Sequence, residues 1–178
     1  MSILPKLTLS NDSIRLELCS LSHVEGLQKA VADGELWRLW YTAIPTVGGV
    51  ENEVKNRLAL YEEGTWLPFT VFQVVNGVET IVGMTNFVNI EMLPHYNRVE
   101  IGGTWYAKST QGTGINTMAK YLMLQYAFEQ WHVLAVELRT HKVNAQSRRA
   151  IAQLGAKQDA ILRAQRLMAN GTIRDTVV

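Results

Sequence analysis

Apolar and polar residues alternate along this chain with two different periods. Over residues 14–18 every second side chain is apolar, which is the spacing of a half-buried strand. After residue 114 the apolar residues recur at intervals of three and four, which is the spacing of one face of a helix. The pattern predicts helices over residues 22–32, 50–63, 115–131 and 144–154, and strands over residues 14–18, 66–75, 79–90, 98–101, 134–140, 156–168 and 172–178.

Short polar motifs mark the ends of several of these elements. Ser22-His23-Val24-Glu25 has the form of a capping box. Asn76-Gly77 predicts a type I′ hairpin turn, which needs positive φ at both residues, and Asn170-Gly171 predicts a second turn. Asn144 is placed to cap the last helix and Gly155 to end it. The predicted order of elements is β-α-α-β-β-β-α-β-α-β-β, an α/β arrangement.

Composition indicates a single globular domain. The chain has 178 residues, of which 47% are hydrophobic and 19% charged, and no linker, repeat or low-complexity tract divides it. We therefore expect one domain over residues 1–178. The formal net charge of +1 gives no general attraction to nucleic acid or to an anionic membrane. No apolar stretch approaches the ~18 residues that a membrane-spanning helix needs.

Cysteine and histidine usage narrows the chemistry. Cys19 is the only cysteine, so the chain forms no internal disulfide and suits a reducing compartment. With no leader pattern at the start of the sequence, the expected location is cytoplasmic. The histidines at positions 23, 95, 132 and 141 lack the spacing of metal ligands, so no metal site is expected.

The most informative stretch lies between the strand ending near residue 106 and the helix beginning at residue 115. Gly112 and Gly114 make this loop flexible enough to approach a ligand closely. The first backbone N–H groups of a helix have no partner within the helix and carry partial positive charge. A strand, a glycine loop and a helix N-terminus together predict a binding site for a phosphate group.

Three known phosphate-binding motifs contain a glycine loop of this kind. A P-loop requires Lys-Ser or Lys-Thr after the second glycine, and none is present. A dinucleotide fingerprint requires a third glycine where Thr117 stands. The sequence Gln111-Gly112-Thr113-Gly114-Ile115-Asn116 resembles the Q/R-x-x-G-x-G/A signature of the GNAT superfamily of acetyl-CoA-dependent N-acetyltransferases, with Asn116 where Gly or Ala is usual.

Other segments extend this resemblance over essentially the whole chain. Glu100-Ile101-Gly102 and Trp105 look like the branch that contains the RimJ/RimL ribosomal-protein-alanine acetyltransferases. Residues 144–156 are similar to the N-x-x-S-x-x-A…L-G-A segment of the family. The resemblance implies a GNAT fold: a mostly antiparallel twisted sheet, splayed between its fourth and fifth strands and flanked by about four helices.

The resemblance also implies acetyl-CoA as the cosubstrate, with no metal. The pantetheine arm would pair with the backbone near Trp105 and Tyr106, and the loop would hold the pyrophosphate. The expected coenzyme-binding residues are Trp105, Tyr106, Gln111, Gly112, Thr113, Gly114, Ile115, Asn116, Thr117, Asn144 and Ser147.

Two residues have the catalytic roles that the resemblance implies. Glu100 would accept the proton of the amine, although it could instead be an ordinary exposed strand residue. The proton donor to the departing thiolate would be Ser147, because Ile151 stands where many GNAT enzymes have a tyrosine. Ser147 could equally just support the first turn of its helix. Cys19 is remote in sequence from the motif, so we expect direct transfer in a ternary complex and no acetyl-enzyme.

The acceptor amine is the least determined part. Aromatic residues that could line its site are Trp37, Trp40, Tyr41 and Phe87, and acidic residues that could anchor an amine are Glu35, Glu62, Glu63 and Glu91. These side chains suit a protein N-terminal α-amine, which we prefer, or a small-molecule amine such as a polyamine, amino acid or antibiotic. A catalytically silent acyl-CoA-binding module is a third possibility. The sequence leaves open whether the protein is a monomer or a homodimer.

Overall fold

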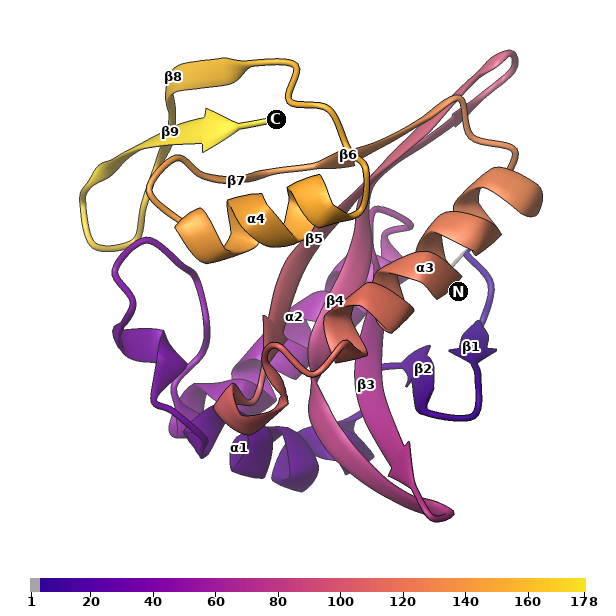
Figure 1. Ribbon diagram of the computed structural model, residues 1–178, viewed down its shortest axis with the longest axis vertical. Helices are drawn as coiled ribbons and strands as arrows, with labels where there is room; N and C mark the ends of the chain where they lie inside the picture. Colours follow the sequence, from indigo (N-terminus) through magenta and orange to yellow (C-terminus); the bar gives the residue numbers. More distant parts are fainter. Residues whose placement is uncertain (1–3) are drawn as a thin grey trace.

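The computed structural model of the chain describes residues 4–178, which form two β-sheets and four α-helices (Figure 1). The first sheet has the order β1-β2-β3-β4-β5-β6 and the second the order β7-β9-β8. The strands are β1 (Thr8–Ser10), β2 (Ile14–Leu18), β3 (Leu67–Val75), β4 (Val78–Leu93), β5 (Tyr96–Tyr106), β6 (Ala135–Leu138), β7 (Thr140–His141), β8 (Ile161–Leu167) and β9 (Ile173–Val177). The helices are α1 (Val24–Ala32), α2 (Val50–Glu62), α3 (Ile115–Glu129) and α4 (Ala145–Gln153).

The predicted fold class is confirmed. Neighbouring strands are antiparallel except β5 and β6, which are parallel because α3 carries the chain back between them. The prediction lacked β1, and it took residues 134–140 as one strand. In the structure this stretch is two strands in different sheets, with Arg139 between them. None of the helices within residues 4–178 is long and apolar enough to cross a membrane.

The local end signals were mostly read correctly. Asn76 has a φ of 51° and Gly77 a φ of 76°, and a type I′ turn requires positive φ at both residues. The capping box at Ser22 is wrong, because the chain enters α1 through a 3₁₀ turn over Leu21–His23. Ser20, which is extended, supplies the side-chain cap of that turn by accepting a hydrogen bond from the Ser22 N–H. Ser22 itself lies inside the turn and cannot act as the cap.

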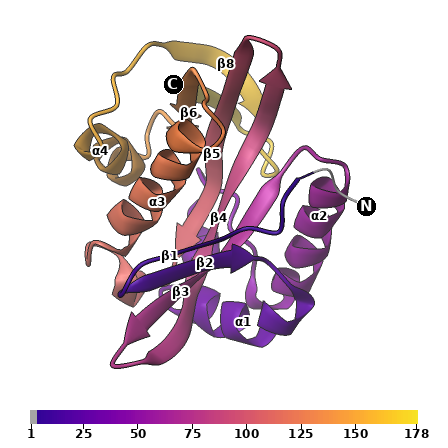
Figure 2. The ribbon, with the colours of Figure 1, turned by 90° about the vertical axis from the view of Figure 1, so that its right-hand side faces the viewer.

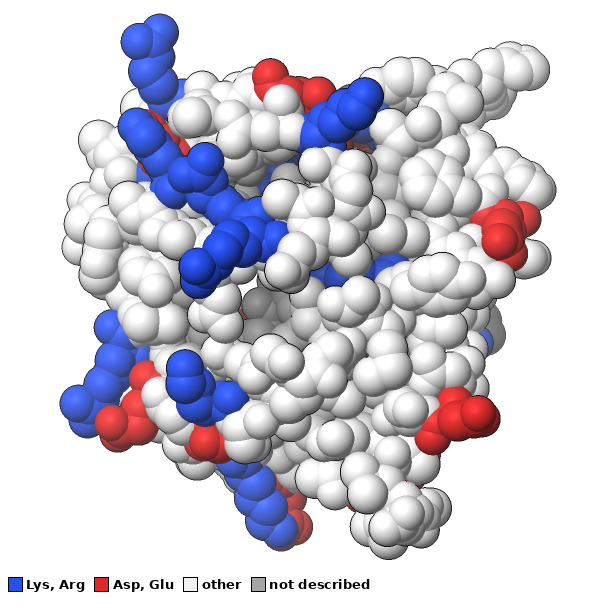
Figure 3. All heavy atoms as spheres, in the orientation of Figure 1, with Lys and Arg blue, Asp and Glu red and all other residues white. Residues whose placement is uncertain are grey.

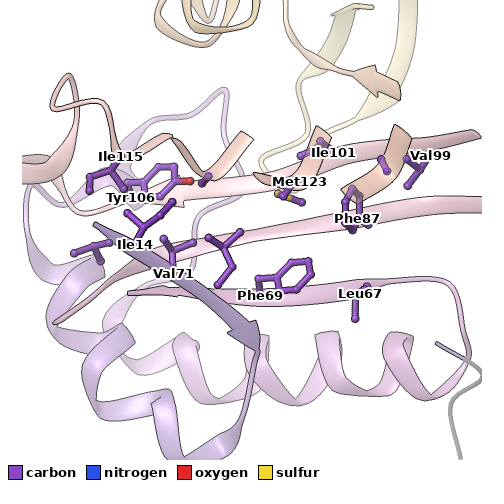
Figure 4. Close-up of a cluster of buried hydrophobic side chains, with 14 of the residues drawn as sticks. Ile14, Leu67, Phe69, Val71, Phe87, Val99, Ile101, Tyr106, Ile115 and Met123 are labelled. Atoms are coloured by element: carbon purple, nitrogen blue, oxygen red, sulfur yellow. The ribbon is translucent and has the colours of Figure 1, made fainter. Parts of the chain in front are cut away.

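Helices cover both faces of the first sheet: α1 and α2 lie on one side and α3 on the other (Figure 2). The core beneath α3 contains large side chains from four strands, and Figure 4 shows part of it: Ile14, Leu67, Phe69, Val71, Phe87, Val99, Ile101, Tyr106, Ile115 and Met123. A second core under α1 and α2 includes Trp105 and Met84. Burial on both faces explains why the central strands are apolar with little alternation.

A β-bulge changes the direction of side chains near the end of β5. Met84 is opposite Trp105 but Asn86 is opposite Gly102, so β5 contains one extra residue, and Gly103 has a φ of 59°. Without the bulge, the side chain of Trp105 would point to the same face as that of Ile101. With it, Ile101 packs in the core under α3 whereas Trp105 packs in the core under α1 and α2.

The first sheet opens beyond the bulge. β5 pairs with β6 only from Arg98 to Ile101, and within the described chain no strand pairs with this edge of β5 from Gly102 onward. The chain leaves β6 at Leu138 and joins the second sheet at Thr140. The expected splay is therefore confirmed and lies between β5 and β6, which are the fourth and fifth strands when β1 is not counted.

Candidate active site

The loop from β5 to α3 presents an open backbone surface at the splayed end of the sheet. Gly112 and Gly114 have φ of 78° and 93°, values that strongly favour glycine. Apart from the glycine itself and its two neighbours in the chain, no described atom lies within 4 Å of where a Cβ would stand on either residue. Gly114 is the N-cap of α3, and no side chain of the described residues caps it. The free N–H groups and positive end of α3 therefore face open space, which fits an anionic ligand.

Side-chain hydrogen bonds fix the shape of this loop. Thr113 Oγ1 donates to the carbonyl of Thr110 at 2.7 Å, and Gln111 Nε2 donates to the carbonyl of Tyr106 at 3.2 Å. Gln111 Oε1 in turn accepts from Gln146 Nε2 on α4 at 2.8 Å. The loop is thus held to the end of β5 and to α4 before any ligand arrives.

Asp33, just after α1, ties the start of the loop to the other face of the sheet. Its carboxylate accepts from the Ser109 N–H at 2.8 Å, and its carbonyl accepts from the Lys108 N–H at 3.2 Å. The hydrogen bonds from Ser109 lower the pKa of Asp33. A side chain on Gly34 would collide with Lys108, whose Cβ would lie 2.4 Å away.

The predicted coenzyme-binding residues lie together around this opening, but they do not all offer side chains. The side chain of Ile115 is buried in the core, so only its backbone can reach a ligand. Asn116 is half-buried, and Thr117 is exposed. Trp105 and Tyr106 are buried, and neither Trp105 Nε1 nor the Tyr106 hydroxyl has a partner among the described residues. Burial raises the pKa of Tyr106, which therefore stays neutral.

Asn144 and Ser147 occupy the start of α4, which Gln146 joins to the loop. Asn144 Oδ1 accepts from the Ser147 N–H at 3.1 Å, which confirms Asn144 as the N-cap. Ser147 is half-buried, and no hydrogen bond of its hydroxyl occurs within residues 4–178. The hydroxyl is therefore available to a ligand.

Glu100 lies on β5 beside a small cleft. The cleft has a volume of ≈ 280 Å³ and is lined by Thr65, Asn89, Ile90, Glu91, Arg98, Val99, Glu100, Glu137 and Arg139. Glu100 Oε2 accepts from Asn89 Nδ2 at 2.7 Å and lies 3.6 Å from Arg139 Nε. Its side chain is 13% exposed. A carboxylate so oriented and reachable can accept a proton from a ligand in the cleft.

The residues that orient Glu100 were not predicted. Asn89 is on a bulge of β4, with φ of 48°, and the bulge turns its amide toward Glu100. Arg139 also pairs with Glu137 at 2.8 Å, and Glu137 forms an ion pair with Arg98. Only the parallel register, which sets Glu100 opposite Glu137, brings these groups together, and no local sequence signal gives that register.

The aromatic residues between α1 and α2 lie in two places. Trp40 and Tyr41 pack edge-on against His141 of β7, with ring centroids 5.2 and 6.2 Å away. Asn170, in the turn from β8 to β9, donates to the Trp40 carbonyl at 3.0 Å. Trp40 is 51% exposed and can contact a ligand, whereas Trp37 packs against the core under α1 and α2.

Phe87, expected at the acceptor site, is instead a core residue. It is fully buried, with its ring 6.0 Å from Phe69 and 4.8 Å from Trp131 (Figure 4). It points from β4 toward α3 and has no surface that a substrate could contact. The run from Val82 to Val88 is buried on both faces, so its sequence does not reveal which side each residue takes.

Two buried cations hold the bulge of β5 from opposite faces. From α3, Lys120 Nζ donates to the hydroxyls of Thr85 and Thr104, each at 2.8 Å. From α2, Arg57 donates to the carbonyl of Gly103 at 3.2 Å and to Asn86 Oδ1 at 2.9 Å. Neither cation was predicted to matter, because their sequence positions suggest ordinary helix residues.

The sequence and the fold are similar to those of known proteins. The acetyltransferase (GNAT) domain model matches residues 14–157. The chain belongs to the GNAT acetyltransferase family. It is therefore an N-acetyltransferase, and enzymes of this family use acetyl-CoA. No curated protein sequence matches this GNAT enzyme.

Solved structures agree with the family. A protein from T. thermophilus assigned to the acetyltransferases is 26% identical, with a TM-score of 0.79 over 99% of this chain and 89% of that one. RimL, a ribosomal alpha-N-protein acetyltransferase, is 17% identical, with a TM-score of 0.81 over 96% and 91%. The microcin self-immunity acetyltransferase MccE, solved with acetyl-CoA and AMP, is 18% identical, with a TM-score of 0.79 over 94% and 91%. These last two share the fold, which at such identities is all that the likeness shows.

Proposed function

We propose that this GNAT enzyme transfers the acetyl group of acetyl-CoA directly to a protein N-terminal α-amine, within a complex that holds both substrates. The observation that carries the proposal is the layout of β5. At its open end lies an uncapped helix N-terminus with two open glycines, and farther back along the strand Glu100 borders a cleft. The first feature suits a diphosphate and the second suits a proton acceptor. One domain, residues 1–178, would carry out the reaction.

The loop and the free edge of β5 would hold the coenzyme. The backbone N–H groups of residues 112–117 would bind the pyrophosphate, and the main chain of Trp105 and Tyr106 would pair with the pantetheine arm. The absence of any described atom in front of Gly112 and Gly114 supports this assignment. Asn144 and Ser147 would flank the arm from α4. Bound there, acetyl-CoA supplies an activated acetyl thioester.

Glu100 would act as the general base. An amine attacks only when neutral, and an N-terminal α-amine has a pKa near ~8 whereas lysine is near ~10.4, so an α-amine needs less help. As the new N–C bond forms, Glu100 would take the proton that the nitrogen loses. Asn89 and Arg139, which hold Oε2, leave the other carboxylate oxygen to do this.

Ser147 would return a proton to the other product. When the C–S bond breaks, the electron pair would stay on sulfur, and the thiolate would take the hydroxyl proton of Ser147 while that oxygen takes a proton from water. The free hydroxyl at the start of α4 supports this role. A main-chain N–H near Trp105 would stabilise the negative charge that develops on the carbonyl oxygen.

The only cysteine favours this direct route over an acetyl-enzyme. Cys19 is 2% exposed, and burial raises the pKa of its thiol to about 12. A buried thiol that keeps its proton is a poor nucleophile. The Cys19 N–H donates to the carbonyl of Pro68 in β3, and β4 lies between β3 and β5.

The choice of acceptor rests on the resemblance to the RimJ/RimL branch and on the exposed aromatic residue Trp40, which lies in the loop between α1 and α2. Trp40 exposes half of its surface next to the second sheet, as a surface that receives a peptide would. The alternative is a small-molecule amine, which the ≈ 280 Å³ cleft beside Glu100 could also accommodate. A silent acyl-CoA-binding module is the remaining alternative.

Release of free CoA thiol across a panel of amines tests the proposal. The panel contains short peptides with Ala, Ser or Met N-termini, the same peptides with blocked N-termini, polyamines, amino acids and aminoglycosides. Turnover only with free N-termini is expected. Turnover confined to small amines would move the function to metabolite or antibiotic acetylation. Acetyl-CoA binding without turnover on any amine would support the silent module.

A further inference from the structure

Two arginines face each other across the second sheet, and neither forms an ion pair within the described part of the chain. Arg166 of β8 is directly opposite Arg174 of β9, so both side chains project from the same face. Like charges at opposed positions of a sheet destabilise it. Within residues 4–178 neither arginine takes part in an ion pair. Such a pair is expected to persist where an anion binds between the two guanidinium groups.

Arg174 is the more constrained of the two. It is half-buried, and its Nε is buried without a hydrogen-bond partner in the described part of the chain. Burial and the nearby charge of Arg166 lower the pKa of Arg174. A buried N–H donor of a charged group costs free energy until it is satisfied. Arg174 therefore has an unused donor, and its charge has no ion-pair partner among the described residues.

The register places this pair of arginines next to the aromatic residues Trp40 and Tyr41, which contact His141. Thr176 of β9 is opposite His141 of β7, and it lies two residues from Arg174, so all three share one face. His141 on this face contacts Trp40 and Tyr41. Figure 3 shows basic side chains gathered over β8 and β9 and extending toward a hollow near the middle of the face.

Arg174 also lies within electrostatic range of the proposed base, Glu100. Glu100 and Arg139 both act on the charge of Arg174, Glu100 by stabilising it and Arg139 by opposing it. The neighbouring carboxylate Glu137 is already paired with Arg139 and Arg98. Within residues 4–178, therefore, no carboxylate forms a direct ion pair with Arg166 or Arg174.

We propose that Arg166 and Arg174 bind a carboxylate of the acceptor, so that the preferred acceptor is a peptide N-terminus followed closely by Asp or Glu. This inference rests on the proposed function, because it takes Glu100 as the place where the amine reacts. Planar guanidinium groups bind carboxylates in a two-point geometry. The amine would lie at Glu100 and the acidic side chain between the two arginines, with the residues that follow along Trp40.

The test compares peptides that differ only in charge. Ala-Glu-Glu and Ala-Gln-Gln peptides of equal length are assayed with acetyl-CoA, and the ratio of their kcat/KM values is measured. For the unaltered enzyme we expect the acidic peptide to be favoured by about tenfold or more, from the usual strength of charge-assisted hydrogen bonds. Arg166→Gln should bring this ratio close to one, mainly by raising KM for the acidic peptide. Added salt should reduce the ratio in the unaltered enzyme.

Arg163→Gln is the matched control, because it removes the same charge from the same strand. Asp175 alternates with Arg174 and Thr176 along β9 and therefore projects from the opposite face of the sheet. The charge of Arg163 acts on Asp175, so Arg163 lies on that opposite face. For Arg163→Gln, the ratio of kcat/KM between the acidic and the neutral peptide should equal that of the unaltered enzyme. Arg166 is exposed, so its replacement should not prevent folding. Arg174→Gln is a second variant, checked by its thermal unfolding.

The outcomes separate this inference from the function on which it rests. Equal kcat/KM for both peptides, or an equal loss in Arg163→Gln, would overturn the carboxylate site. Preference for free glutamate over the acidic peptide, with the same dependence on Arg166, would overturn the peptide as its source. If no amine is acetylated, the proposed function fails. The carboxylate site can then still be tested by the fluorescence anisotropy of a labelled acidic peptide, measured with CoA present. Weaker binding to Arg166→Gln than to Arg163→Gln supports the site, and equal binding overturns it.

Discussion

Lys120 Nζ lies 2.8 Å from the hydroxyl oxygen of Thr104, the residue that follows Gly103 in the bulge of β5. Burial lowers the pKa of Lys120 to about 7, because an ammonium group inside the protein has lost its water. The protein thus keeps a titratable amine in its interior, just beyond the point where β5 and β6 stop pairing. Its protonation state should influence both stability and the geometry of the open edge.

Stability should rise with pH because of Lys120. The folded protein loses this proton near pH 7, whereas the unfolded chain keeps it until near pH 10.5. Between these values the unfolded chain binds more protons, so the free energy of unfolding increases with pH, by up to about 4 kcal/mol. Above pH 10 the buried Tyr106 reverses the trend, because only the unfolded chain then ionises this tyrosine readily.

Urea unfolding from pH 6 to 10 measures this dependence. In Lys120→Met the increase should disappear, while the hydrogen bond between Thr85 and Thr104 can remain. Lys29→Met is the control, since Lys29 is exposed and paired with Glu25 on the surface. The prediction is wrong if Lys120→Met keeps the same slope as the unaltered protein.

Gly114→Val should weaken acetyl-CoA binding much more than it lowers stability. The backbone at φ of 93° resists a side chain, at a cost of roughly 1–3 kcal/mol, but the space around it is open. The valine side chain would fill that space and block a phosphate. Gly77→Val provides the control: Gly77 also has positive φ and open surroundings, but it lies in the β3–β4 hairpin. Calorimetric titration with acetyl-CoA should separate the two variants, and similar affinities would contradict the phosphate site.

Glu100→Gln should lower kcat by about 10²–10⁴ at neutral pH, which is the usual contribution of a general base. The loss should shrink at high pH, because the acceptor amine then loses its proton unaided. A pH profile of kcat with a peptide acceptor measures this. Glu91→Gln is the control, as Glu91 lines the same cleft but is exposed. A loss that stays constant with pH would exclude the base role.

Ser147→Ala should reduce turnover without reducing stability. Its backbone N–H can still donate to Asn144, so the cap of α4 remains, and alanine favours a helix. We expect kcat to fall by about tenfold or more, with an unchanged melting temperature. Asn144→Ala should instead cost about 1 kcal/mol, because the cap itself is lost. An active Ser147→Ala enzyme would assign the proton to water.

The features of the fold and the site that could be predicted from the sequence depend on local chemistry. The glycine loop, the cap at Asn144 and the turn at Asn76 each specify a backbone conformation through nearby residues alone. The features that could not be predicted depend on the pairing of strands that are distant in the sequence. The bulge at Gly103 and the opposition of Arg166 to Arg174 exist only through register. A sequence that is apolar on both faces of a strand leaves that register undetermined.

Asp33 connects the two halves of the site through one carboxylate. It ends α1, from which the loop with Trp40 begins, and it binds the Ser109 N–H, at the start of the loop that leads into α3. A ligand that orders either loop also restrains the other, so the second ligand has less entropy to lose on binding. Coenzyme and acceptor should therefore increase each other's affinity, and by the same factor in both directions.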